Sequence, residues 1–141
     1  MTVKPRLLIV SLVHPFPRNA GQQQRVYYKL RALREDFRIV FLTVAPHAQQ
    51  SEVQQKLLEL CDEAIVLPSI YTRSLLTRFI HKTAGIVFSL LTGLKFSNYL
   101  AGKVELSPAR AAQAIAGRDF EAALFEYWHT HETARLLGAR G

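Results

Sequence analysis

The sequence predicts an α/β domain in which a parallel β-sheet lies between two layers of helices. Residues 7–13 (LLIVSLV) are almost wholly apolar, which is typical of a strand buried on both faces of a parallel sheet. Further short apolar segments follow, and they alternate with segments whose apolar residues have helical spacing. With 141 residues, 49% of them hydrophobic, the chain is long enough for one domain with a core, and we treat residues 1–141 as that domain.

The first half of the chain predicts three strands joined by two helices. The strand at 7–13 precedes a helix at 22–34, and residues 37–44 form a second strand, rich in β-branched and aromatic residues, that stops before Pro46. Ser51, with Gln54 three residues later, has the pattern of a capping box and predicts the start of the second helix. Residues 64–67 form a short third strand that ends at Pro68.

The second half predicts two more helices and a fourth strand. Ser107 followed by Pro108 has the pattern of an N-cap and first helical residue, so a helix is expected over 108–116. Residues 122–128 form the fourth strand, and a last helix starts near Thr130. Right-handed crossovers then give a three-layer, Rossmann-like parallel sheet in the order 3-2-1-4, with the first strand in its interior.

Residues 71–103 interrupt this alternation. They form a basic amphipathic segment: apolar residues recur at helical spacing, and no acidic residue occurs from Ala64 to Val104. Such a segment is typical of a helix that lies on an anionic membrane surface. The alternative is an ordinary helix packed on the sheet with a solvated basic face. No stretch of the chain has the uncharged apolar length of a membrane-spanning helix.

The net charge indicates the class of partner, and the cysteine content indicates the compartment. The net charge of +7 favours acidic partners such as anionic lipid, phosphorylated small molecules or nucleic acid, although a merely basic surface is the better explanation of the charge alone. The single cysteine, Cys61, excludes an internal disulfide and fits a reducing compartment, so we expect a cytoplasmic location, at the inner face of the membrane if 71–103 touches lipid. We expect Cys61 to be a packed thiol.

The loop at residues 14–21, which follows the first predicted strand, is the best candidate site. In a doubly wound sheet this loop lies at the carboxyl end of the strand, where ligands bind. Gly21 allows a close approach of the backbone, and the free N–H groups of the helix start, together with Arg25 one turn later, favour an anion such as phosphate. His14 is placed to hydrogen-bond sugar hydroxyls in its neutral form.

The pattern Pro15-x-Pro17-x-x-x-Gly21-x-x-x-Arg25 after the first strand resembles the amino-terminal domain of family 4-like glycosyltransferases of the GT-B architecture. It is similar in particular to the branch that acts in bacterial surface polysaccharide assembly. The run from Leu57 to Pro68 and the run from Phe120 to Tyr127 also look like that branch. The resemblance extends over nearly the whole chain.

The resemblance implies a transferase that moves a sugar from a nucleotide sugar to a lipid-linked or saccharide acceptor, with no other cofactor. The amino-terminal domain would face the acceptor, and a carboxyl-terminal domain would hold the donor. The substrate-binding candidates are His14, Pro17, Asn19, Gly21, Arg25, Glu126 and His129. The catalytic residues stay unassigned.

The chain also departs from the family's pattern. The paired glutamates of the family's E-x7-E motif and a later strand that often bears a histidine are both missing before Gly141. We therefore expect an incomplete, truncated GT-B amino-terminal domain that is inactive by itself. Its fourth strand should leave an apolar edge exposed around Leu124, Phe125 and Tyr127.

Other classes of function compete with this interpretation. A dinucleotide-binding module is disfavoured because the chain has no G-x-G-x-x-G motif and its second strand does not end in an acidic residue. A non-catalytic basic module that docks on a membrane or a partner remains the main alternative. The pair His129 and His131 supplies too few ligands for zinc, so no metal site is expected, and the tyrosines at 27 and 28 fit a packed helix boundary better than nucleic-acid stacking.

Overall fold

The computed structural model describes residues 3–93, 104–127 and 130–138. Four parallel strands form one sheet in the order β3-β2-β1-β4: β1 (Arg6–Val10), β2 (Arg38–Ala45), β3 (Glu63–Pro68) and β4 (Ala122–Phe125). In the sheet Leu8 lies between Val40 of β2 and Ala123 of β4. The predicted strand order is therefore confirmed, and so is the interior position of the first strand.

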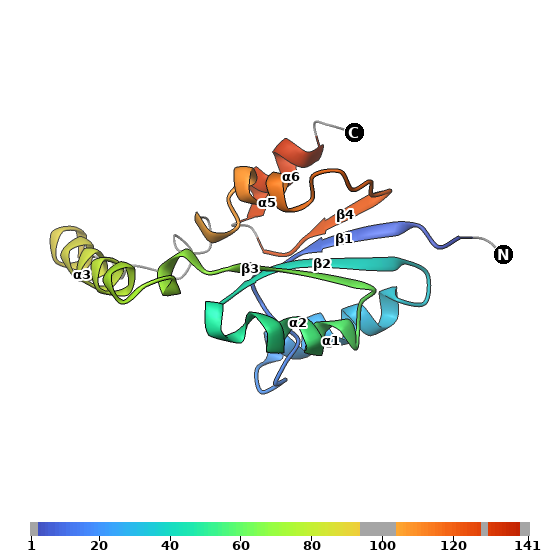
Figure 1. Cartoon of the computed structure of the whole chain (residues 1–141), viewed down its shortest axis with the longest axis horizontal. Coiled ribbons are helices and arrows are strands. Elements are labelled where there is room, and N and C mark those ends of the chain that lie inside the picture. Colours follow the sequence, from blue (N-terminus) through green and yellow to red (C-terminus); the bar gives the residue numbers. More distant parts are fainter. Residues whose placement is uncertain (1–2, 94–103, 128–129, 139–141) are drawn as a thin grey trace.

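Helices cover both faces of the sheet, as Figure 1 shows. Helices α1 (Gly21–Leu33) and α2 (Gln50–Leu58) lie on one face, and α5 (Pro108–Ala114) and α6 (His131–Gly138) lie on the other. Side chains of β1 alternate between the two cores, with Leu7 and Ile9 on the α1 face and Leu8 and Val10 on the α5 face. This is the expected three-layer, Rossmann-like arrangement.

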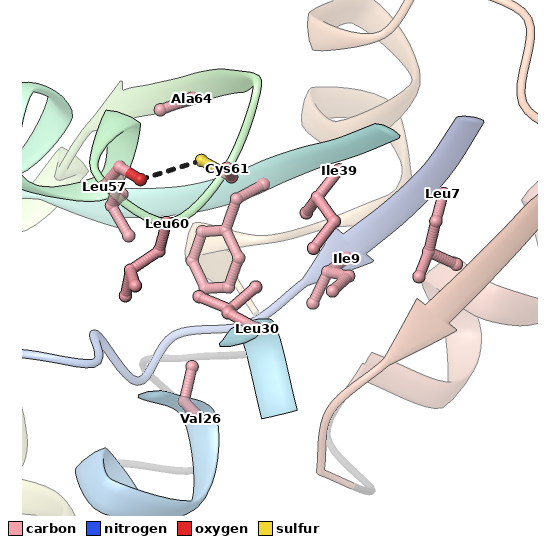
Figure 2. Packing of buried hydrophobic residues seen from close by; sticks show 10 residues of the cluster. Leu7, Ile9, Val26, Leu30, Ile39, Leu57, Leu60, Cys61 and Ala64 are labelled. Carbon is pink, nitrogen blue, oxygen red and sulfur yellow. Dashed lines mark hydrogen bonds between the residues drawn. The ribbon is translucent and has the colours of Figure 1, made fainter. Parts of the chain in front are cut away.

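The core between the sheet and helices α1 and α2 contains the single cysteine. Leu30, Leu57 and Ile39 belong to the same core, part of which Figure 2 shows. The Cys61 thiol lies just after α2 and donates a hydrogen bond to the carbonyl of Leu57, with 3.1 Å between Sγ and O. Burial raises the pKa of the Cys61 thiol to about 12, so the thiol stays protonated and unreactive. The expectation of a packed thiol is confirmed.

Two boundaries predicted in the first half of the chain are wrong. The first strand ends at Val10 and not at Val13, because the Ser11 hydroxyl accepts a hydrogen bond from the backbone N–H of Val13 and turns the chain. Helix α2 begins before Ser51, and Gln54 does not cap it. Instead Gln54 Nε2 donates to the carbonyl of Ala64 at 3.0 Å, and Gln50 Nε2 donates to the carbonyl of Val66 at 2.8 Å, so α2 covers open carbonyls along the outer edge of β3.

The opposite edge of the sheet is less protected. Strand β4 is four residues long and ends at Phe125, earlier than the predicted end at 128, which lies outside the described residues. We predicted an exposed apolar edge at Leu124, Phe125 and Tyr127, but all three are half-buried, and the exposed residues of this edge are Ala122 and Ala123. The prediction of an open edge holds for the backbone, while its apolar side chains are partly covered.

Helix α3 (Leu75–Thr92) extends away from the sheet and follows the short helix η2 (Ile70–Thr72), as Figure 1 shows; the other short helix, η1 (His47–Gln49), precedes α2. The Ser74 hydroxyl caps α3 by accepting from the N–H of Thr77, and Gly93, with φ of 67°, ends it. None of its residues is buried, and Phe79 and Leu90 are 66% and 79% exposed. The alternative in which this helix packs on the sheet is therefore wrong.

The two faces of α3 are reversed relative to an ordinary surface helix. The half-buried positions Thr77, His81 and Gly85 lie along one face, and the His81 ring packs on Tyr71 with 4.0 Å between the ring centroids. Phe88 is half-buried on the same face as His81. The other large apolar residues lie on the opposite face and are exposed; they are Leu75, Leu76, Phe79, Ile80, Ile86, Val87, Leu90 and Leu91. Among the described residues, no helix is both long enough and apolar enough to span a bilayer. Residues 94–103 of the predicted basic segment lie outside the described part of the chain.

Candidate functional site

The candidate site lies where β1, β2 and β4 end, and the loop from Ser11 to Ala20 crosses this end of the sheet before α1 begins. In sheets of this kind the carboxyl ends of the strands and the switch point between strands on either side of β1 form the ligand crevice. The predicted site residues come from this loop, from the start of α1 and from the end of β4.

Two glutamines of α1 hold the loop in place. Oε1 of Gln23 accepts hydrogen bonds from the backbone N–H groups of Asn19 at 2.9 Å and Ala20 at 3.2 Å, and Nε2 of Gln23 donates to the carbonyl of Phe16 at 3.1 Å. Gln24 donates from Nε2 to the carbonyl of Arg18 at 3.2 Å. Sequence reasoning missed both residues, although a glutamine three positions after the helix cap is a known capping signal.

Three backbone donors remain open at the start of α1. Helical hydrogen bonding begins with the N–H of Gln24, which donates to the carbonyl of Ala20. The N–H groups of Gly21, Gln22 and Gln23 have no acceptor in the part of the chain that the structure describes. Ala20 has no side-chain oxygen that could cap them. They can therefore donate to an anion, and the helix dipole favours negative charge at the same place.

Gly21 leaves open space at this helix start. No atom of the protein lies within 4 Å of the position that a Cβ would occupy at Gly21, and its backbone is helical. Neither packing nor backbone strain in the protein therefore requires a glycine here. The space would let a ligand approach the backbone. Arg25, one turn later, is exposed and available to the same ligand.

The end of β4 contributes a buried carboxylate. Glu126 is 6% exposed, and its N–H donates to the carbonyl of Val10 at 2.9 Å, which extends the pairing of β4 with β1. Its Oε1 accepts a hydrogen bond from the ammonium group of Lys29 on α1. This ion pair connects the helix that follows the first strand to the last strand of the sheet.

The next residue, Tyr127, has a left-handed backbone with φ of 70°. Burial and the neighbouring carboxylate of Glu126 raise the pKa of the Tyr127 hydroxyl, while Arg25 and Lys29 act in the opposite direction. Arg25 is thus close enough to this cluster to influence it electrostatically. A non-glycine residue in this conformation is strained, and such strain is often found at binding sites. Sequence analysis did not assign Lys29 or Tyr127 to the candidate site.

His14 lies on the side of the loop that faces β2 and α2. Its Nε2 is 2.9 Å from the carbonyl of Val44, which can only accept a hydrogen bond, so Nε2 carries the proton. Burial lowers the pKa of His14, against the opposing effect of that hydrogen bond. The ring is therefore neutral at neutral pH, and its Nδ1 has no hydrogen-bond partner among the described residues.

The predicted site residues fall into two groups. Gly21 and Arg25 on α1 lie on the side of the crevice where Glu126 ends β4. His14 and Pro17 line a separate cavity beside α2. Asn19 is exposed between the two groups, and its backbone N–H is already bonded to Gln23. His129 lies outside the described residues. Among the described residues, no group of His, Cys, Asp and Glu side chains could hold a metal ion.

The arrangement is suited to binding an anion next to neutral polar groups. The described residues bring together cationic side chains, open backbone donors and one buried carboxylate that already has a cationic partner. Comparison with known proteins adds no assignment: no protein-family model, no curated protein and no solved structure matches the chain.

Proposed function

We propose that the chain is the acceptor-side, amino-terminal part of a GT-B glycosyltransferase that transfers a sugar from a nucleotide sugar to a lipid-linked or saccharide acceptor in surface polysaccharide assembly. In this proposal a carboxyl-terminal domain supplies most of the donor site, and this chain alone has no transferase activity. The enzyme works in the cytoplasm, against the inner face of the membrane. The proposal rests on the loop motif from Pro15 to Arg25 and on the site's geometry.

The observation that carries the proposal is the open start of α1 at the carboxyl end of β1. A nucleotide sugar presents a diphosphate, and the unpaired N–H groups of Gly21, Gln22 and Gln23 are suitable donors to one of its phosphates. Arg25 would neutralise the same charge. The space beside Gly21 permits the approach, and the glutamine-braced loop keeps the donors in position without a ligand.

The experiment that tests this function uses the complete reading frame. The DNA immediately downstream of codon 141 is sequenced first, and an in-frame domain with an E-x7-E motif is expected. The complete polypeptide is then assayed for release of nucleotide from nucleotide sugars in the presence of a membrane extract as acceptor. Transfer that Arg25→Ala weakens supports the proposal. A stop codon at this point, or turnover that is indifferent to Arg25, contradicts it.

The exposure of α3 favours a second function, docking on an anionic membrane surface. Eight large apolar residues on one face of this helix are more than half exposed, which is costly in water unless a partner covers them. The helix carries Arg78 and Lys82 and has no acidic residue. A helix with an apolar face and basic flanks lies in the interface of an anionic bilayer. This function is compatible with the first, because lipid-linked acceptors are found at the same surface.

Vesicle sedimentation tests the membrane function. We expect the chain to sediment with vesicles that contain anionic lipid and to be released as salt rises, because each basic residue near the surface contributes roughly 1 kcal/mol that salt screens. Arg78→Gln together with Lys82→Gln should reduce binding, whereas Arg38→Gln with Lys4→Gln, at the other end of the sheet, should matter less. Equal binding to neutral and anionic vesicles would contradict the electrostatic part of the proposal.

A further inference from the structure

A cavity of about 260 Å³ lies between the loop after β1 and helix α2. Its apolar lining comes from Phe16, Pro17, Val53 and Leu57, and its polar lining comes from His14, Gln49, Glu52 and Lys56. Leu57 is buried, and Phe16, Val53 and His14 are half-buried, whereas the other lining residues are exposed. The cavity therefore has an apolar interior and a polar mouth.

The cavity has no net charge. His14 is neutral because burial lowers its pKa. At the mouth, Nζ of Lys56 is 2.6 Å from Oε1 of Glu52, one helical turn away, and the two charges cancel. A phosphate or another small anion would gain nothing here relative to the open start of α1. A neutral ligand fits this electrostatic environment better.

Two polar groups of the cavity, those of His14 and Glu52, offer acceptors to a ligand, beside the ammonium donor of Lys56. Because Nε2 of His14 is bonded to Val44, the ring nitrogen left for a ligand is Nδ1, which is unprotonated. Glu52 pairs with Lys56 through Oε1, so its other carboxylate oxygen remains available. The amide of Gln49 can donate or accept. A ligand rich in hydroxyl donors would satisfy these groups.

The apolar lining suits the C–H face of a ring. Phe16 is held by an edge contact with Tyr27, with 6.1 Å between the ring centroids, and its carbonyl is bonded to Gln23. The wall next to His14 is therefore preorganised before any ligand arrives. The volume lies just below the range of about 300–1,000 Å³ that is typical of drug-sized ligands, so one ring fits and a disaccharide would extend into solvent.

We propose that this cavity binds one neutral sugar ring, whose hydroxyl groups donate to Nδ1 of His14 and to the free carboxylate oxygen of Glu52 while its C–H face packs against Phe16. The ring belongs to the saccharide part of the acceptor, and this identification rests on the proposed function above. The cavity is separate from the anion site at Gly21 and Arg25, so the two sites bind chemically different parts of the reactants.

The test is a titration of the isotope-labelled chain with three uncharged methyl glycosides, those of glucose, galactose and N-acetylglucosamine, followed by backbone amide shifts. We expect at least one glycoside to shift the amides of His14 and Phe16 and those of residues 49–57, and to leave Gly21 and Arg25 unchanged. His14→Phe, which removes Nδ1, should weaken that binding about 2- to 12-fold, the effect of one hydrogen bond. His47→Phe, at an exposed histidine outside the cavity lining, is the matched control and should change nothing.

A second variant guards against misfolding of His14→Phe, which also removes a partner of Val44. Gln49→Trp changes an exposed residue at the mouth, so it should fold normally and still block entry. The proposal is overturned if no glycoside shifts the amides of His14 and Phe16, or if Gln49→Trp binds a glycoside as well as the unmodified chain. A titration with inorganic pyrophosphate distinguishes the proposal for the cavity from the proposal for the transferase. If pyrophosphate shifts Gly21 but no glycoside binds, only the assignment of the cavity is contradicted. If a glycoside binds in the cavity but pyrophosphate does not shift Gly21, the assignment of the cavity stands, and the transferase proposal loses its support.

Discussion

Lys29 of α1 donates a hydrogen bond to the buried carboxylate of Glu126 at the end of β4. The two residues are far apart in the sequence, and their pairing joins the helix after the first strand to the last strand of the sheet. The side chain of Glu126 is 5% exposed and that of Lys29 is 32% exposed. A charge as buried as that of Glu126 is stable only with a partner.

Removing Lys29 should therefore destabilise the fold. Lys29→Met leaves the carboxylate of Glu126 buried without its cation, and we expect the free energy of unfolding to fall by about 1–3 kcal/mol. The double variant Lys29→Met with Glu126→Gln should lose less free energy of unfolding than the two single variants lose together. Urea denaturation of all four proteins gives the coupling energy, and strict additivity would show that the pair is not an interacting unit.

Stability should also depend on pH through His14. Because burial lowers the pKa of His14 in the folded chain, the unfolded chain binds a proton below pH 6.5 that the folded chain resists. The free energy of unfolding should therefore fall as pH drops below 6.5, until the folded state also binds the proton. The charged groups beside the ring in the cavity, Glu52 and Lys56, are exposed and form an ion pair, and Lys56 lowers the pKa of Glu52. Below pH 6.5 the free energy of unfolding should fall less in His14→Gln than in the unmodified chain. In the control His47→Gln it should fall as much as in the unmodified chain. Equal pH profiles for all three proteins would contradict the burial effect.

The apolar face of α3 should contribute nothing to the stability of the isolated chain. Phe79 and Leu90 are exposed, so Phe79→Asp with Leu90→Asp should change the free energy of unfolding by less than about 0.5 kcal/mol per site. The same pair should abolish sedimentation with anionic vesicles. As a control, Leu30→Asp, at a buried position of α1, should prevent folding. An unfolded double α3 variant would mean that this face is covered in the protein.

The open edge at β4 should promote association between copies of the chain. Its backbone groups face away from β1 without a strand partner among the described residues, and the exposed side chains there are the small Ala122 and Ala123. Ala123→Lys places a charge on this edge and should reduce the apparent mass at high concentration, whereas Ala109→Lys, on the surface of α5, should not. Sedimentation velocity separates the outcomes, and a chain that is monomeric before substitution contradicts the prediction.

The sequence predicted the fold well where its signals were local and strong. The uniformly apolar residues of β1 identified an interior strand, and the Pro and Gly residues between segments gave the element order. It failed at the capping box of α2, because Gln54 gains more by bonding to Ala64 on the sheet edge than by capping its own helix. That bond depends on the packing of α2 against β3, which the sequence pattern does not contain.

The candidate site was predicted less completely. Gly21 and Arg25 were identified from a motif, and their surroundings agree with an anion site, but the roles of Lys29, Tyr127 and Gln23 depend on contacts across the fold. The sequence also left the position of α3 undecided, because a helix that packs on a sheet and a helix that lies on a bilayer have the same apolar pattern. Its half-buried face, which carries Thr77 and Gly85, settles the direction in which the stripe points.

The central claim is that the open start of α1 binds the phosphate of a substrate, and a titration with inorganic pyrophosphate followed by backbone amide shifts tests it most directly. The account predicts shifts at Gly21, Gln22 and Gln23, and weaker binding by about 1.5–3 kcal/mol in Arg25→Ala, the range for a charged hydrogen bond. Gly21→Val should fold normally, because nothing lies within 4 Å of the added Cβ, and should still block binding. Arg78→Ala, on α3, should bind as the unmodified chain does. Shifts confined to α3, or unchanged titrations for both Gly21→Val and Arg25→Ala, would contradict the claim.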